Sequence, residues 1–147
     1  MKPKAARNMD PTTAHGSCLC GDVSFDAPMP ARWVAHCHCT RCRRAHGAAF
    51  VTWVSVDAER ATITDAKQRL HWFDAGQGGQ RGFCSRCGSP MFFRGDRWPG
   101  ELHIARALFH EPLAQEPMVH ACWDTHVSWV HLADDNLPRK PAPAAGP

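Results

Sequence analysis

Residues 36–47, HCHCTRCRRAHG, place three cysteines, three histidines and three arginines within twelve positions. Thiolates and imidazoles are the side chains that bind zinc in proteins, and a C-x-x-C spacing also occurs in dithiol redox sites. Arginines beside such a site bind carboxylates well. The segment is therefore a candidate for a metal site, a redox switch or a basic patch.

Eight cysteines in 147 residues are more than a core of this size needs. Seven of them lie in three short motifs: C-x-C at 18–20, C-x-C-x-x-C at 37–42 and C-x-x-C at 84–87. The last motif, CSRCGSP, has the form of a zinc knuckle, in which a glycine relaxes the turn so that backbone amides point at the thiolates. One knuckle supplies two ligands, so a structural zinc needs a second pair from elsewhere in the chain.

Two partitions of the seven cysteines satisfy this need. A zinc ribbon would join the pairs at 39–42 and 84–87, but the 41 residues between them exceed the usual spacing and three cysteines stay unused. The partition that we favour uses all seven, as one saturated structural site and one three-thiolate group whose fourth position stays open, the arrangement of a catalytic zinc. Its four structural ligands are Cys18, Cys20, Cys84 and Cys87, and its second group is Cys37, Cys39 and Cys42.

Other interpretations of these cysteines remain open. The four structural candidates could be buried free thiols or disulfides. The three others could form a second structural zinc site, a disulfide on oxidation or a redox pair, although no thioredoxin-like βαβ pattern surrounds them.

The remaining candidates lie beside the cysteines. His36 and His38 alternate with them, so on an extended segment their rings point away from the sulfurs. We therefore expect these histidines to contact the metal ligands rather than the metal, or to lie on the surface. His46 is expected to be solvated, with an approach to metal or substrate as the alternative. Cys122 is most simply a small buried apolar residue; a place near the second metal is the alternative.

The fold is predicted to be mainly β, because short segments with alternating, β-branched or aromatic residues are separated by Gly and Pro. One turn of helix is expected in 40–47. The domain is predicted to span 15–138, between flexible tails at 1–14 and 139–147. Strands are expected within 22–27, 48–56, 69–75, 79–84, 90–95, 101–107 and 118–124.

Composition narrows the classes of protein. The formal net charge of +3 falls to zero if seven thiolates bind two Zn²⁺ ions, so the basic excess of a nucleic-acid binder is missing. The first 16 residues lack the apolar stretch of a secretory signal, and no run of about 18 apolar residues could span a membrane. We therefore expect a cytoplasmic protein, where metal binding is more common than disulfides.

Three segments, GSCLCGDVSF, CHCTRCRRAHGAAF and FCSRCGSPMFF, in this order, resemble the glutathione-dependent formaldehyde-activating enzyme family, which also includes centromere protein V. The resemblance covers residues 15–138. It implies a β-tent fold of packed antiparallel sheets and two zinc sites, divided among the cysteines as in the favoured partition.

The resemblance also implies an activity, that of S-(hydroxymethyl)glutathione synthase, a carbon–sulfur lyase that joins formaldehyde to the glutathione thiol. A zinc held by Cys37, Cys39 and Cys42 could keep the glutathione sulfur as a thiolate. Arg43 and Arg44 would bind the glutathione carboxylates, or else form a solvated face.

Two functions of other classes remain as alternatives. A non-catalytic zinc module would bind a protein or a nucleic acid, and a thiol protein would serve in redox chemistry or metal buffering. We expect the enzyme; the sequence leaves its thiol, its aldehyde and its oligomeric state open.

Overall fold

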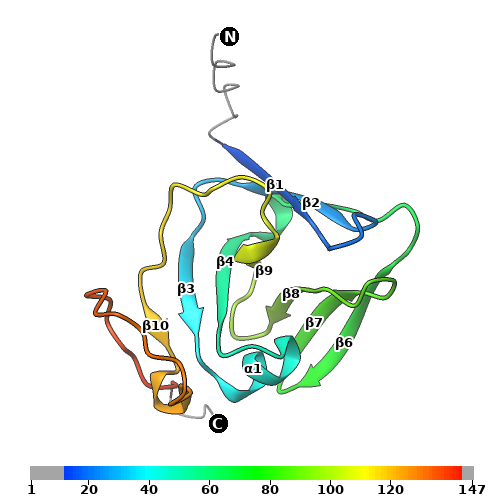
Figure 1. The fold of residues 1–147 in the computed structure, drawn as a ribbon. Helices are drawn as coiled ribbons and strands as arrows, with labels where there is room; N and C mark the ends of the chain where they lie inside the picture. Colours follow the sequence, from blue (N-terminus) through cyan, green and yellow to red (C-terminus); the bar gives the residue numbers. More distant parts are fainter. Residues whose placement is uncertain (1–11, 144–147) are drawn as a thin grey trace, which may run out of the picture.

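The computed structural model describes residues 12–143, which form two β-sheets (Figure 1). The smaller sheet has the strand order β1-β2-β5, with bounds Thr13–Ser17, Ser24–Pro28 and Thr62–Thr64. The larger sheet has seven strands: β10 (His120–Ala121), β3 (Trp33–Cys37), β4 (Val51–Asp57), β9 (Glu101–Ala105), β8 (Pro90–Gly95), β7 (Gly79–Cys84) and β6 (Leu70–Gly76). Neighbouring strands are antiparallel, except that β10 pairs with β3 in parallel.

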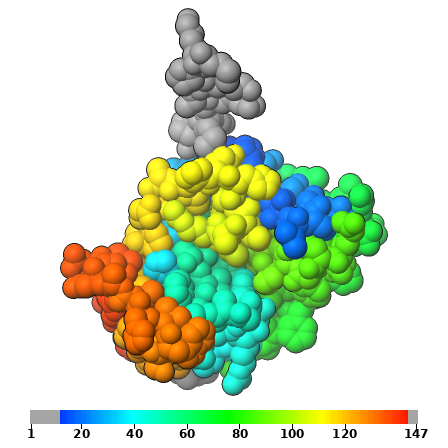
Figure 2. Space-filling model, in the orientation of Figure 1, coloured from blue at the N-terminus to red at the C-terminus, as the bar shows by residue number. Residues whose placement is uncertain are grey.

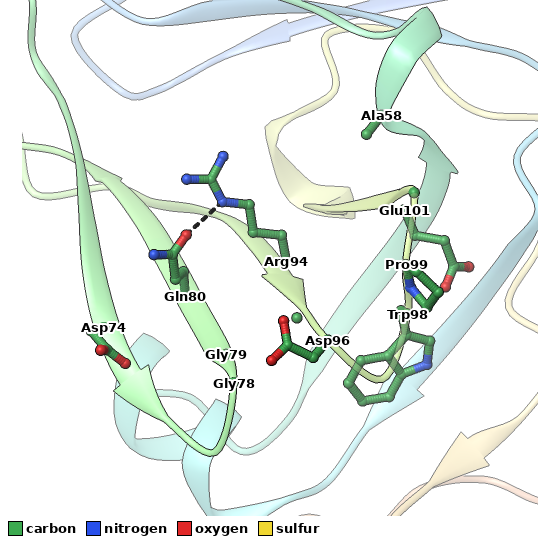
Figure 3. Close-up of a pocket in the computed structure, with 12 residues that line it drawn as sticks. Ala58, Asp74, Gly78, Gly79, Gln80, Arg94, Asp96, Trp98, Pro99 and Glu101 are labelled. Carbon is green, nitrogen blue, oxygen red and sulfur yellow. Dashed lines mark hydrogen bonds between the residues drawn. The ribbon is translucent and has the colours of Figure 1, made fainter.

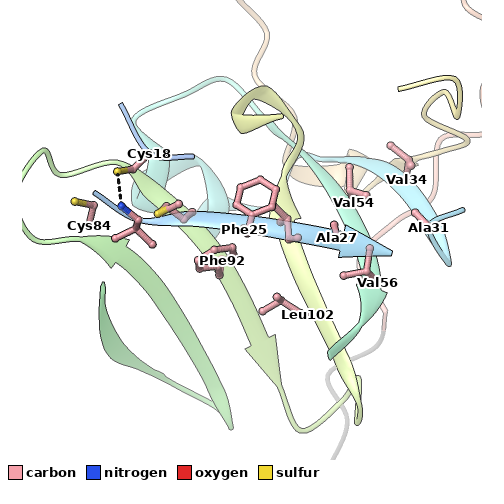
Figure 4. Packing of buried hydrophobic residues seen from close by; sticks show 13 residues of the cluster. Cys18, Phe25, Ala27, Ala31, Val34, Val54, Val56, Cys84, Phe92 and Leu102 are labelled. Carbon is pink, nitrogen blue, oxygen red and sulfur yellow. Dashed lines mark hydrogen bonds between the residues drawn. The ribbon is translucent and has the colours of Figure 1, made fainter. Parts of the chain in front are cut away.

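The main core lies between the two sheets (Figure 4). Phe25 of β2 is buried, and its ring meets that of Phe92 of β8 edge to face, with 5.7 Å between the ring centroids. Val54 of β4 joins the same cluster. Cys18 and Cys84 also belong to it, so the first cysteine motif and the last one border the core that holds the sheets together.

The second cysteine motif begins the helix α1, Thr40–His46. Cys39 is its N-cap, because the thiol sulfur accepts a hydrogen bond from the backbone N–H of Cys42 at 3.2 Å. Gly47 ends the helix in the left-handed region at φ 58°, where its N–H donates to the carbonyl of Arg43. The helix has seven residues, about two turns, and is thus longer than the single turn expected.

The prediction of a mainly β fold with packed sheets is confirmed. Each of the seven expected segments contains or overlaps a strand, while β1, β3 and β5 were not expected. The strand β5 has only three residues, and β3 is hidden in the sequence because it runs directly into the cysteine motif at Cys37. Short 3₁₀ helices follow β4, β9 and β10 at Ala58–Arg60 (η1), Arg106–Leu108 (η2) and Trp123–Thr125 (η3).

Within the described residues, parts of both segments expected to be tails belong to the folded domain. The strand β1 begins at Thr13. At the other end, the N–H of His120 donates to the carbonyl of Pro138 and the N–H of Lys140 donates to the carbonyl of His120, each at 2.9 Å. These bonds hold residues 138–140 beside β10. Residues 1–11 and 144–147 of the expected tails lie outside the described residues. Within 12–143, no helix is long and apolar enough to cross a membrane.

Candidate metal centres and their surroundings

Four cysteines from two distant turns converge beside the core. Their sulfurs all lie within 4.8 Å of one another, and two of the separations are 3.6 Å and 3.8 Å. Four sulfurs bound tetrahedrally to one zinc at about 2.3 Å are about 3.8 Å apart, so this donor set fits zinc. We call it the first cysteine group: Cys18, Cys20, Cys84 and Cys87.

Backbone geometry holds the first cysteine group in place. The N–H of Val23 donates to Sγ of Cys18 at 3.4 Å (dashed in Figure 4), and the N–H of Gly88 donates to the carbonyl of Cys84 at 2.8 Å. Gly88 adopts φ 80°, a conformation that other residues rarely take. The glycine of the knuckle is therefore required by the turn that brings the last two sulfurs together.

The second cysteine group comprises Cys37, Cys39 and Cys42, whose sulfurs also lie within 4.8 Å of one another. They come from the end of β3, the N-cap of α1 and the first turn of that helix. The structure thus brings together the same two sets of cysteines that the favoured partition of the sequence groups.

Two hydrogen-bond donors from other strands reach Cys42. Nε1 of Trp53 on β4 lies 3.5 Å from Sγ of Cys42, and Nη2 of Arg81 on β7 lies 3.6 Å from it. The guanidinium of Arg81 also stacks over the ring of Phe93, 5.1 Å from its centroid. These donors place partial and full positive charge at a buried sulfur and fix its direction.

Sequence reasoning missed both donors, because they are close to Cys42 only through the order of strands in the sheet. One signal was present for Arg81, which precedes the knuckle by three positions on the same strand, β7. Trp53 offered no signal beyond its aromatic type.

Cys122 departs from the expectation of an apolar buried residue. The residue before it, Ala121, pairs with Cys37 in the parallel ladder of β10 and β3, so Cys122 lies beside the second cysteine group. Interaction with the thiols of Cys37 and then of Cys39 lowers the pKa of Cys122 to about 4, whereas interaction with Cys122 raises the pKa of Cys37. The eighth cysteine of the chain therefore belongs to the same cluster of thiols.

A chain of polar side chains begins in the second cysteine motif at His38; His38 and His120 are buried, and Asp135 is exposed. Nε2 of His120 lies 2.6 Å from Oδ2 of Asp135, and Nδ1 of His120 lies 2.8 Å from Nε2 of His38. Because an ionised carboxylate only accepts, Nε2 of His120 donates to Asp135. The hydrogen bond from His120 lowers the pKa of Asp135 to about 2, and burial lowers that of His38 to about 4.

Neither of the two alternating histidines lies free on the surface. His38 is 2% exposed, and its Nδ1 has no hydrogen-bond partner among the described residues. His36 is half-buried and forms a hydrogen bond of 2.8 Å with the hydroxyl of Thr52. His46, on the last turn of α1, packs its ring against that of Trp53 at 5.2 Å. All three histidines therefore pack beside the second cysteine motif instead of extending into solvent.

The arginines of the motif point to different partners. Nη1 of Arg43 donates to the carbonyl of Thr125 at 3.0 Å, which ties α1 to the segment after β10. Figure 2 shows that segment, in orange, beside the cyan region that contains α1. Arg41 donates to the carbonyl of Ala75, and Arg44 is exposed.

A cleft of about 710 Å³ borders α1 through His46, four residues after Cys42. The edge of β4 and the segment after β9 form its other walls, with Phe50, Arg106 and Glu116 among the lining residues. Its size lies in the range of small-molecule sites.

A second cleft lies at the opposite ends of these strands (Figure 3). Trp98 lines it together with Gln80 and Arg94, whose Nε donates to Oε1 of Gln80 at 2.7 Å. This cleft opens near Gly79, where β7 begins, whereas Cys84 ends that strand. None of its lining residues is a cysteine.

Comparison with known proteins agrees with this geometry. The sequence profile of a family described as "Glutathione-dependent formaldehyde-activating enzyme" matches residues 13–125. The chain belongs to this family.

Two relatives show how far the similarity extends. A Halomonas elongata protein named "Putative glutathione-dependent formaldehyde-activating enzyme" is 30% identical over 124 residues, which cover 80% of this chain and 79% of that protein. The crystal structure of a Rhodobacter sphaeroides protein superposes with a TM-score of 0.57 at 20% identity, over 68% of this chain and 91% of that one. The second likeness concerns the fold alone.

Proposed function

We propose that the chain is a zinc-dependent enzyme that joins formaldehyde to a thiol such as glutathione, the reaction of an S-(hydroxymethyl)glutathione synthase and thus of a carbon–sulfur lyase. Membership in the family supports the reaction. The observation that carries the proposal is the second cysteine group, three thiols within 4.8 Å of one another at the start of α1. The last turn of the same helix borders a cleft at His46.

Zinc is proposed in both cysteine groups. In the first, four sulfurs saturate the ion, so its role is structural. In the second, zinc would supply a coordination position at which a substrate thiol loses its proton near neutral pH. The residues of this chain assist by placing Trp53 and Arg81 against Sγ of Cys42, because these donors reduce the negative charge on that sulfur and fix its direction.

Binding of the thiol substrate is assigned to the arginines of α1. Glutathione carries two carboxylates, and guanidinium groups bind carboxylates through paired hydrogen bonds. Arg44 is exposed, and Arg43 donates to a carbonyl through Nη1 only, which leaves its other N–H groups for a ligand. We propose both as substrate-binding residues. Since the described cysteines are all free thiols, we place the protein in a reducing compartment such as the cytoplasm.

The proposal is tested by measuring adduct formation from formaldehyde and glutathione by exchange NMR. The zinc-loaded protein is expected to form the adduct faster than the spontaneous reaction, whereas Cys39→Ser is expected to leave only the spontaneous rate. Ser128→Ala, at an exposed position, serves as the control and should keep the full rate. A zinc-loaded protein without any rate above the spontaneous one would contradict the proposed function.

A further inference from the structure

Cys122 follows directly on Ala121, which pairs with Cys37 in the parallel ladder of β10 and β3. Its thiol interacts with those of Cys37 and Cys39, while the mutual set within 4.8 Å consists of Cys37, Cys39 and Cys42. Cys122 is half-buried.

A strand pairing and two hydrogen bonds to His38 hold the segment of Cys122 against the cysteine motif. The parallel pairing of β10 with β3 sets Ala121 opposite Cys37, and the N–H of His38 donates to the carbonyl of Ala121 at 2.9 Å. The hydroxyl of Thr125 lies 3.0 Å from the carbonyl of His38 and 3.2 Å from that of Cys122. The turn that carries Cys122 is therefore attached to the residue between the first two cysteines of the motif.

The backbone of Cys122 itself adopts an uncommon conformation. Its φ of 54° and ψ of 42° lie in the left-handed region, which costs a residue with a Cβ about 1 kcal/mol. Such a conformation persists where the surrounding structure fixes it, and it is frequent at functional sites. Here it turns the chain from β10 into η3 at the point where the thiol meets Cys37 and Cys39.

We propose that Cys122 is the fourth sulfur donor of the metal ion in the second cysteine group. Zinc takes four ligands, and four thiolates are one of its common donor sets. The eight cysteines then divide into two sets of four. Its segment is fixed beside Cys37 and His38, so Cys122 is the one remaining cysteine that can complete the second set.

The inference rests on the metal-binding part of the proposed function and adds a consequence for the substrate. If all four positions hold cysteine sulfurs, an incoming thiol must take the place of one of them. Cys122 is the member that lies outside the mutual set, so it is the sulfur that a substrate thiol would replace, with the proton of the incoming thiol passing to the departing Cys122 thiolate. Its segment, after β10, is also the one joined to α1 through Arg43.

The test compares zinc binding in the full chain, Cys122→Ser, Cys122→Ala and the control Ser128→Ala. Competition with a chromophoric chelator reports one affinity for each bound zinc. Both Cys122 variants are expected to bind the weaker zinc at least about tenfold less tightly, with the tighter zinc unchanged; the control should keep both affinities. Circular dichroism verifies that each variant folds.

Alkylation by iodoacetamide followed by peptide mass spectrometry provides an independent measurement on the unmodified chain. Cys122 is expected to be protected in the zinc-loaded protein and modified after zinc is removed. Equal modification with and without zinc, together with unchanged affinities in the variants, would overturn the proposal. Neither measurement depends on activity, so a failure here leaves the proposed reaction to its own test.

Discussion

The indole Nε1 of Trp53 donates a hydrogen bond to Sγ of Cys42 at 3.5 Å. Trp53 is 4% exposed on β4, and Cys42 is buried on α1. This bond joins the larger sheet to the cysteine motif, and it withdraws charge from a sulfur that is proposed to bind zinc. Groups that hydrogen-bond a metal ligand tune both its orientation and the affinity of the site.

Trp53→Phe tests this role, because it removes the donor and retains an aromatic ring in the core. We expect zinc at the second cysteine group to bind about tenfold less tightly, with the first group unaffected, as measured by chelator competition. Trp129→Phe is the matched control, since Trp129 is 67% exposed. Equal affinities in the two variants would show that the hydrogen bond has no influence on the site.

The knuckle glycine gives a second prediction. Gly88 and Gly100 adopt φ 80° and φ 77°, and a Cβ added to either would meet no atom within 4 Å. Alanine at either position therefore costs about 1 kcal/mol of stability through backbone strain alone. Only Gly88→Ala is expected to weaken zinc binding at the first cysteine group, because only Gly88 belongs to its turn. Denaturant unfolding and zinc titration measure the two effects; a weaker zinc site in Gly100→Ala as well would contradict this account.

The cysteine motifs could be predicted from their spacing, which left two partitions open, and the partition that uses all seven cysteines matches the two groups in the structure. A place of Cys122 near the second group was only an alternative, and Trp53 and Arg81 could not be predicted, since these residues reach the group through the strand order β10-β3-β4 and through β7. The parallel pair of β10 with β3 has only two residue pairs, too few for a pattern in the sequence. Long-range strand pairing thus decided which residues surround the sulfurs.

A buried histidine outside the cysteine groups predicts how stability depends on pH. His103 of β9 is 3% exposed between aromatic rings that include those of Trp33 and Trp98, at 4.6 Å and 5.3 Å. Burial lowers its pKa to about 4, although Glu101 opposes this shift. The unfolded chain binds a proton at this residue near pH 6.5, and the folded chain does so only near pH 4. Stability therefore falls as the pH decreases from 6.5 to 4.

His103→Phe is expected to remove this contribution. The variant should be at least as stable as the natural chain at pH 7, because it replaces a buried nitrogen that lacks a hydrogen-bond partner among residues 12–143. Between pH 6.5 and 4 its stability should fall less steeply, by up to about 1.4 kcal/mol per pH unit. Urea unfolding at several pH values measures both slopes. Parallel curves for the two proteins would refute the assignment.

Native mass spectrometry of the full chain tests most directly whether its cysteines form two separate metal centres. After expression with zinc, the intact protein is expected to carry two zinc ions, and Cys39→Ser is expected to retain the one in the first cysteine group. A natural chain that binds a single zinc ion when zinc is in excess, or a Cys39→Ser variant that still carries two, would contradict the account.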